Sequence, residues 1–213
     1  MISAQFERVT SLLCLGAHPD DIEIGCGGTI LKLLGLYPSV NVHWVVLSGA
    51  PERRNEAQHC ARHFLAGARS ATVVVKDFRD RFFPYCGGQI KEYFFELAMN
   101  VQPDLILTHR LEDRHQDHRL VSELTWNTFR DHVILEYEIP KYEGDLGHPN
   151  LFVDLDQDTC ARKIEAIVTA FRSQRKRAWF SSETFWSLLR LRGLEADPSA
   201  EFAEGLFARK LLV

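Results

Sequence analysis

The feature that most constrains the fold is an alternation of short apolar runs with amphipathic stretches. Five apolar runs have the length of a strand, at 12–16, 40–47, 72–75, 105–108 and 133–139. Between them, apolar residues recur at steps of three and four, most clearly from Ala57 to Ala68, as on one face of a helix. Alternating strands and helices are typical of a parallel sheet built from βαβ units. We therefore predict an α/β protein with a three-layer, Rossmann-like fold and a mostly parallel sheet.

The length predicts a single domain. With 213 residues, 46% of them hydrophobic and 25% charged, the chain can fill and cover one core, and disordered, collagen-like and coiled-coil classes are excluded. We expect the domain to span 1–213, with a loop at 140–150 and, from about residue 181, a C-terminal helix and extension.

The charge and the apolar pattern restrict the partners and the location. A formal net charge of -4 argues against nucleic acid, whose binding depends on clustered Lys and Arg. No apolar stretch approaches the roughly 20 residues that cross a bilayer, and the first ten residues do not resemble a signal peptide. Five scattered cysteines without a CxxC pair predict neither disulfides nor a thiolate metal cage. We expect a cytoplasmic protein with a small-molecule substrate and no membrane span, and a homo-oligomer is left open.

Two segments rich in His and Asp follow predicted strands. HPDD at 18–21 comes after the first strand, and HQDH at 115–118 comes after the fourth. Ligands bind at the carboxyl ends of the strands in an open parallel sheet, so both segments are expected at one edge. Pro19 favours an extended His18, and His115 and His118 share one side of a helical turn. Two imidazoles and a carboxylate, with one position left to water, form the ligand set of a catalytic zinc.

Other interpretations of these residues are weaker. Asp20 and Asp21 could simply occupy the first turn of a helix, where the dipole favours carboxylates, but the coincidence of two such segments at strand ends favours a metal site. A non-haem iron centre uses the same ligand types. Its His and carboxylate are usually separated by one residue on a strand, whereas two residues, one of them Pro19, separate His18 from Asp21. The glycines at 25–28 match no phosphate-binding pattern, and we expect them to allow close packing beneath the metal loop.

Four stretches resemble the LmbE-like, or N-acetylglucosaminyl-phosphatidylinositol de-N-acetylase-like, family of zinc deacetylases. They are AHPDDIEIGCGGT at 17–29, RRNEAQHCARHFLAG at 53–67, PDLILTH at 103–109 and HQDH at 115–118. Members have a Rossmann-like fold and remove acetyl from N-acetylated sugars, glycolipids or glycoconjugates. The resemblance implies a deacetylase that acts on an amino-sugar substrate of the N-acetylglucosamine type, with one Zn²⁺ per chain or another divalent ion in its place.

The resemblance also assigns roles to residues. It implies three zinc ligands, His18, Asp21 and His118. Asp20 would be the general base, and His115, oriented by Asp117, would stabilise the oxyanion in the transition state. Many relatives have an acidic residue at the position of Ile22, and some have a tyrosine at the position of Asp113, so this chain departs from the family there.

Residues that follow other strands are candidates for substrate contacts. They are Arg53, Arg54, Arg79, Asp80 and Tyr142. For each, an exposed residue or a loop anchor is the alternative. Two other functions stay open: a metal hydrolase of another acyl amide or ester, and a non-catalytic carbohydrate-binding protein on the same scaffold. The complete ligand set favours catalysis, whereas the sequence does not specify which carbonyl lies over the metal.

Overall fold

A seven-stranded sheet forms the centre of the computed structural model, which describes residues 5–211. Its strands are β1 (Ser11–Gly16), β2 (Asn41–Val46), β3 (Ser70–Val75), β4 (Leu105–His109), β5 (Val133–Tyr137), β6 (Leu151–Leu155) and β7 (Phe202–Ala208). They lie in the order β3-β2-β1-β4-β5-β7-β6. Strands β1 to β5 are parallel, and β7 is antiparallel to both β5 and β6. The predicted α/β fold with a mostly parallel sheet is confirmed.

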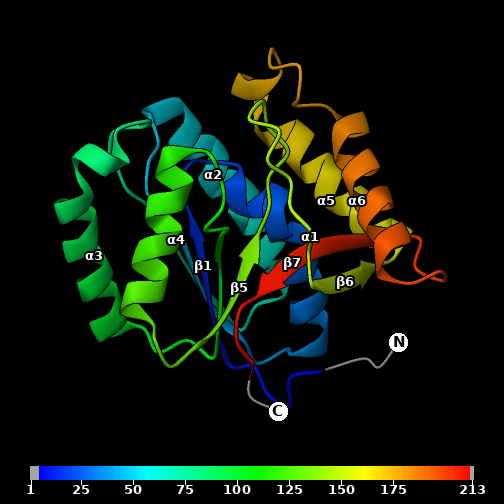
Figure 1. The fold of residues 1–213 in the computed structure, drawn as a ribbon, viewed down its shortest axis with the longest axis horizontal. Helices are drawn as coiled ribbons and strands as arrows, with labels where there is room; N and C mark the ends of the chain where they lie inside the picture. The colour runs from blue at the N-terminus through cyan, green and yellow to red at the C-terminus, as the bar shows by residue number, and fades with distance from the viewer. Residues whose placement is uncertain (1–4, 212–213) are drawn as a thin grey trace.

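Helices cover both faces of this sheet (Figure 1). They are α1 (Asp21–Leu36), α2 (Pro51–Phe64), α3 (Gly87–Asn100), α4 (Gln116–Thr128), α5 (Gln157–Ala170) and α6 (Ser182–Ala196), with short 3₁₀ helices η1 (Leu65–Gly67), η2 (Phe83–Tyr85) and η3 (Arg172–Gln174). Helices α3 and α4 pack together on one face, and α1, α2, α5 and α6 pack on the other. One cluster of buried apolar side chains lies between the sheet and the helices on each face, as the predicted three layers require. None of the helices in the described part of the chain is long and apolar enough to cross a membrane.

The two strands that sequence reasoning did not predict are β6 and β7. Residues 202–208 were expected to belong to a C-terminal extension, but they form a strand between β5 and β6. A carboxylate, Glu204, and a glycine, Gly205, lie in the middle of β7 and interrupt its apolar pattern. Strand β6 is only five residues long, and most of it is partly exposed at the sheet edge. The C-terminal part of the chain therefore completes the sheet.

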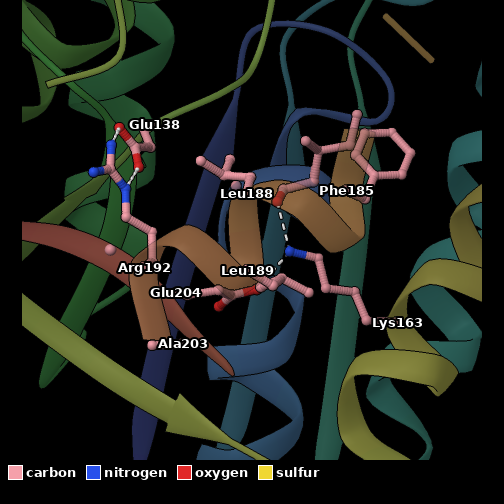
Figure 2. A pocket seen from close by; sticks show the side chains of 11 residues that line it. Glu138, Lys163, Phe185, Leu188, Leu189, Arg192, Ala203 and Glu204 are labelled. Carbon is pink, nitrogen blue, oxygen red and sulfur yellow. Dashed lines mark hydrogen bonds and ion pairs between the residues drawn. The ribbon is translucent and has the colours of Figure 1, made fainter. Parts of the chain in front are cut away.

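Hydrogen bonds and an ion pair compensate the buried carboxylate of Glu204. Its Oε1 accepts the backbone N–H of Gly28 at 2.7 Å and lies 2.6 Å from Nζ of Lys163 on α5. Figure 2 shows Glu204 and Lys163 at a small cavity together with a second ion pair, in which the guanidinium of Arg192 faces the carboxylate of Glu138. The two groups of this second pair are 2.6 Å apart. The contacts of Glu204 join β7 to α1 and α5, and the pair of Arg192 and Glu138 joins α6 to the segment after β5.

The glycine-rich run packs closely, as expected. A side chain at Gly25 would collide with the ring of Tyr137, and one at Gly28 would collide with Leu155. Helix α1 is also kinked at Cys26, whose backbone angles are not helical. Because these glycines have no side chain, the first turns of α1 lie directly against the sheet, beneath the loop that follows β1.

Candidate metal centre

The loop between β1 and α1 forms one half of the centre. Its residues His18, Asp20 and Asp21 are buried, and the His18 N–H donates to Oδ2 of Asp21 at 2.7 Å. Asp20 has a φ of 97°, a left-handed conformation that is uncommon for a residue with a side chain. The Arg53 guanidinium donates to the carbonyl of Pro19 and, at 3.0 Å, to Oδ1 of Asp20. Such strain persists where surrounding contacts fix the backbone, and it is often found at functional sites.

The segment after β4 forms the other half. Helix α4 begins at Gln116 with His115 as its N-cap, and Nδ1 of His115 accepts the N–H of Asp117 at 3.3 Å. The N–H of His115 donates in turn to Oδ1 of Asp113 at 2.7 Å. Asp117 and His118, in the first turn, are buried. Because β4 pairs with β1 in parallel, both halves meet at one edge of the sheet.

Three donor atoms from the two halves form a nearly equilateral triangle. Nδ1 of His18 lies 3.2 Å from Nε2 of His118 and 3.4 Å from Oδ2 of Asp21, and these last two atoms are 3.5 Å apart. Ligand atoms around a tetrahedral zinc, at bonds of about 2.0–2.2 Å, are separated by about 3.3–3.5 Å. The residues therefore fit a divalent ion such as zinc in both donor type and spacing.

Carboxylates hold the second nitrogen of each imidazole in this triangle. Nδ1 of His118 lies 3.0 Å from Oδ2 of Asp113. Nε2 of His18 lies 3.1 Å from Oδ2 of Asp117 and 3.0 Å from Oδ1 of Asp80. A carboxylate on one ring nitrogen fixes the tautomer in which the lone pair of the other nitrogen is free for a metal. Both imidazoles are thus oriented as ligands.

The carboxylate of Asp117 lies on the His18 side of the centre. It contacts His18 and accepts the N–H groups of Arg81 (2.6 Å) and Phe83 (3.2 Å). Among the described residues, this carboxylate has no hydrogen bond with His115. Asp117 contacts the imidazole of His115 through its backbone instead, since its N–H donates to Nδ1 of that ring at 3.3 Å. The carboxylate fixes His18 and the segment that leads into η2.

The acceptor role of Nδ1 determines the tautomer of His115. Because Nδ1 accepts the N–H of Asp117, the neutral ring carries its proton on Nε2. Burial lowers the pKa of His115, and the charge of His18 lowers it further. The neutral imidazole can donate a hydrogen bond from Nε2 without being protonated.

His109 belongs to the centre although its role was not predicted. It is the last residue of β4 and is fully buried, with Nε2 3.1 Å from Oδ2 of Asp21. The same nitrogen lies 3.0 Å from the N–H of Ala17, and the ring stacks on that of His118 at a centroid distance of 3.9 Å. A histidine at the end of a buried strand, at the edge where the motifs meet, is the signal that could have revealed it.

The two adjacent aspartates differ in their electrostatic environment. Burial raises the pKa of Asp20 to about 7, against the opposing effect of Arg53. Burial also acts on Asp21, but the neighbouring imidazoles, with His118 first, outweigh it and hold the pKa of Asp21 well below its usual range. Oδ2 of Asp20 is buried and has no hydrogen-bond partner within residues 5–211. Asp21 is thus held as an anion, while Asp20 can take up and release a proton near neutral pH.

A cavity of about 450 Å³ opens over the centre, a volume in the usual range for small-molecule sites. Three of the five predicted substrate contacts line it: Arg53, Asp80 and Tyr142. Arg54 and Arg79 do not line it. The Arg79 guanidinium instead lies over the ring of Phe82, 3.6 Å from its centroid.

Several lining residues were missed by sequence reasoning. They are Arg81, Arg114, Lys141, Glu143, Gln174, Arg177 and Trp179. They lie in the loops that follow β3, β4 and β5 and in the segment between α5 and α6. Of these residues, only Arg114 could have been predicted to lie near the cavity, because it directly precedes the HQDH motif.

Comparisons with known sequences link the chain to deacetylases. The sequence model described as GlcNAc-PI de-N-acetylase (PIG-L) matches residues 13–129. YaiS of Escherichia coli K12, named as an uncharacterized deacetylase, is 28% identical to this chain, and the match covers 61% of the chain and 74% of YaiS.

Solved structures with the same fold include enzymes of two kinds. The N,N'-diacetylchitobiose deacetylase of Pyrococcus horikoshii matches with a TM-score of 0.71 and 22% identity, over 95% of this chain and 85% of that one. The 4-carboxy-2-hydroxymuconate hydratase of Pseudomonas putida matches with a TM-score of 0.76 and 21% identity, over 96% and 98% of the two chains. At these identities the likeness shows a shared fold, and a shared fold does not by itself specify a reaction.

Proposed function

The chain belongs to the GlcNAc-PI de-N-acetylase (PIG-L) family, and from that premise we propose that it is a metal-dependent deacetylase that hydrolyses the N-acetyl amide of an N-acetylglucosamine-type sugar or glycoconjugate. The observation that carries the proposal is the triangle of donor atoms beside an unpaired carboxylate oxygen of Asp20. The same fold also occurs in a hydratase, so family membership and these residues support the proposal, whereas the fold alone does not.

We assign the metal ligands to the three atoms of the triangle. Nδ1 of His18, Oδ2 of Asp21 and Nε2 of His118 would hold one zinc or another divalent ion. When bound, such an ion lowers the pKa of a water ligand to about 7 and polarises a carbonyl oxygen. Asp113 and Asp117 keep the two imidazoles in the orientation that binding needs.

The remaining steps fall to the residues around the ligands. Oδ2 of Asp20 accepts a proton from the attacking water and delivers it to the amide nitrogen, so that acetate and a free amine leave. A pKa near 7 suits a group that must take up and release a proton at neutral pH. The Nε2 proton of His115 donates to the carbonyl oxygen as negative charge develops on it. Arg53 holds Asp20 in place through Oδ1.

The experiment that tests this function measures acetate release from N-acetylglucosamine and its glycosides by the zinc-loaded protein. We expect turnover by the wild type. In Asp20→Asn, turnover should fall by about 10²-fold or more, as the loss of a general base predicts, while the metal content stays unchanged. His18→Ala and His118→Ala should lose zinc in elemental analysis. Full turnover by Asp20→Asn would refute the base assignment, and full zinc occupancy in both histidine variants would refute the ligands.

The same experiment separates the alternatives. A hydrolase of another acyl amide or ester would release its product from a wider substrate panel but not from N-acetyl sugars. A non-catalytic carbohydrate-binding protein would bind the sugars without any turnover at full metal occupancy.

A further inference from the structure

Three arginines without a carboxylate partner stand around the cavity over the metal centre. Arg81, Arg114 and Arg177 line the cavity and are exposed. Within residues 5–211, their guanidinium groups have no hydrogen bond, ion pair or aromatic contact. They come from three separate segments, one after β3, one after β4 and one after η3. The positive charge is therefore gathered by the fold and not by a single basic stretch of sequence.

The other two cations of the lining are already engaged by carboxylates. Arg53 pairs with Asp20 at 3.0 Å, and Lys141 lies 3.0 Å from Oδ2 of Asp113 and 2.6 Å from Oδ1 of Asp145. These pairs hold the walls of the site together and leave the three arginines available to a ligand.

The acidic residues of the lining do not neutralise the three arginines. Asp21 belongs to the ligand triangle, and Asp80 has its carboxylate on Nε2 of His18. Glu143 is exposed and makes no ion pair with another described residue. None of the three arginines thus forms an ion pair with a carboxylate of the described residues, although, after His18, the charge of Arg81 does act on the neighbouring Asp80 and lowers its pKa.

The backbone of Arg81 is fixed at this position. Its φ of 66° is left-handed, a conformation that is uncommon for a residue with a side chain. Its N–H donates to Oδ2 of Asp117 at 2.6 Å, and its carbonyl accepts the side-chain amide of Gln116. Since Asp117 also holds His18, the same carboxylate positions a ligand imidazole and the arginine beside the cavity.

The backbones around the other two arginines are also held. The N–H of Arg114 donates to Oδ2 of Asp145 at 2.6 Å. Next to Arg177, the N–H of Ala178 donates to the hydroxyl of Tyr142 at 3.3 Å. Trp179 and Tyr142 line the same cavity and supply the apolar surface typical of small-molecule sites.

From this arrangement we infer that the substrate is an N-acetylated sugar that carries an anionic group, a phosphate or a carboxylate, and that Arg81, Arg114 and Arg177 bind this group. The inference rests on the proposed deacetylase function and specifies its substrate class. Guanidinium groups bind phosphate and carboxylate oxygens through charge-assisted, often bidentate hydrogen bonds. An anion among the three arginines would also relieve the repulsion between their like charges, which a neutral sugar would leave in place.

The test compares anionic and neutral substrates of the zinc-loaded wild type. The anionic set is N-acetylglucosamine 1-phosphate, N-acetylglucosamine 6-phosphate and N-acetylmuramic acid, which separate phosphate from carboxylate and one sugar position from another. The neutral set is N-acetylglucosamine and its methyl glycoside. We expect kcat/KM of the best anionic substrate to exceed that of the neutral ones by about tenfold or more, as one charge-assisted hydrogen bond predicts. Added salt should reduce this advantage, because it screens exposed charges.

Substitution of the arginines locates the effect. Arg81→Gln, Arg114→Gln and Arg177→Gln should each lower the ratio of anionic to neutral kcat/KM, mainly through a higher KM for the anionic substrate. Arg62→Gln is the matched control, because Arg62 is an exposed arginine on α2 outside the cavity lining. The control should leave the ratio unchanged.

The outcomes distinguish this inference from the function on which it rests. Equal turnover of neutral and anionic sugars, or a ratio that none of the three arginine variants lowers, would overturn the anionic substrate class while the deacetylase stands. Absence of acetate release from every sugar at full metal occupancy would overturn the deacetylase, and the inference with it.

Discussion

Asp113 lies beside an imidazole of the proposed metal centre without belonging to the triangle of donor atoms. Its Oδ2 lies 3.0 Å from Nδ1 of His118. Burial acts to raise the pKa of Asp113, but the hydrogen bond from His118 and the charge of Lys141 hold it below its usual range. A permanent anion at this position strengthens the imidazole as a ligand.

We therefore predict that Asp113→Asn weakens metal binding. The asparagine has a similar shape but lacks the charge, so the metal affinity should fall by about 10–100-fold, the usual effect of losing such a partner. Competition with a chromophoric chelator measures the affinity. Asp145→Asn is the control, because Asp145 contacts Lys141 and the N–H of Arg114 but no imidazole. Equal affinities in the two variants would show that Asp113 does not support His118.

At the residue scale, sequence reasoning predicted which side chains meet at the edge of the sheet better than it predicted which side chains line the cavity. The HPDD and HQDH motifs each lie in a short turn at a strand end, so the parallel pairing of β1 and β4 is enough to bring them together. The substrate contacts depend on the path of a loop. Arg79 was expected in the cavity and Arg81 was found there, because a left-handed turn at Arg81, fixed by Asp117, decides where each side chain points. No local pattern in the sequence indicates that turn.

At the element scale, the start of α5 depends on a single cap. Asp156 precedes the helix, and its Oδ1 accepts the N–H of Thr159 at 2.6 Å. This hydrogen bond lowers the pKa of Asp156. The stabilisation is therefore present above the ordinary aspartate pKa and is lost as the pH falls through the lower pKa of the folded state.

We predict that Asp156→Ala lowers the free energy of unfolding by about 1 kcal/mol at pH 7, the usual effect of losing such a cap. The difference from the wild type should shrink below about pH 4, where aspartate becomes protonated. Urea denaturation at several pH values measures both effects. Glu165→Ala, an exposed substitution on the same helix, should change stability by less than about 0.5 kcal/mol. A loss for Asp156→Ala that stays constant down to pH 2 would contradict the role of the charged cap.

The elements that sequence reasoning found and missed differ in their apolar pattern. Strand β4 is buried along its whole length, and its run of Leu, Ile and Leu is recognisable by itself. Strand β7 carries Glu204 at a fully covered position, and that residue is acceptable only because Lys163 and the backbone of α1 lie against it in the folded chain. A partner that lies 41 residues away cannot be read from a local pattern.

At the scale of the whole molecule, the pair of Lys163 and Glu204 connects parts of the chain that are distant in sequence. Both side chains are 3% exposed, and Nζ of Lys163 also donates to the carbonyl of Ile24 at 2.7 Å. The pair thus joins α5, the C-terminal strand and the first turns of α1, directly after the metal loop. Breaking a buried pair by removing one partner is costly, because the other charge stays buried without compensation.

The last prediction is a double-mutant cycle on this pair. Lys163→Met should lower the free energy of unfolding by about 3–5 kcal/mol, whereas Lys163→Met combined with Glu204→Gln should cost less than the sum of the single changes. Denaturant titration should give a coupling energy of at least about 1 kcal/mol, in the range of contacting buried residues. The control cycle uses Lys32 and Asp154, an ion pair at 2.5 Å whose side chains are 35% and 75% exposed, and its coupling should stay below about 1 kcal/mol. Equal coupling in the two cycles would mean that Glu204 is compensated by the backbone of α1 alone. In that case Lys163 would not be needed to hold β7 in the sheet.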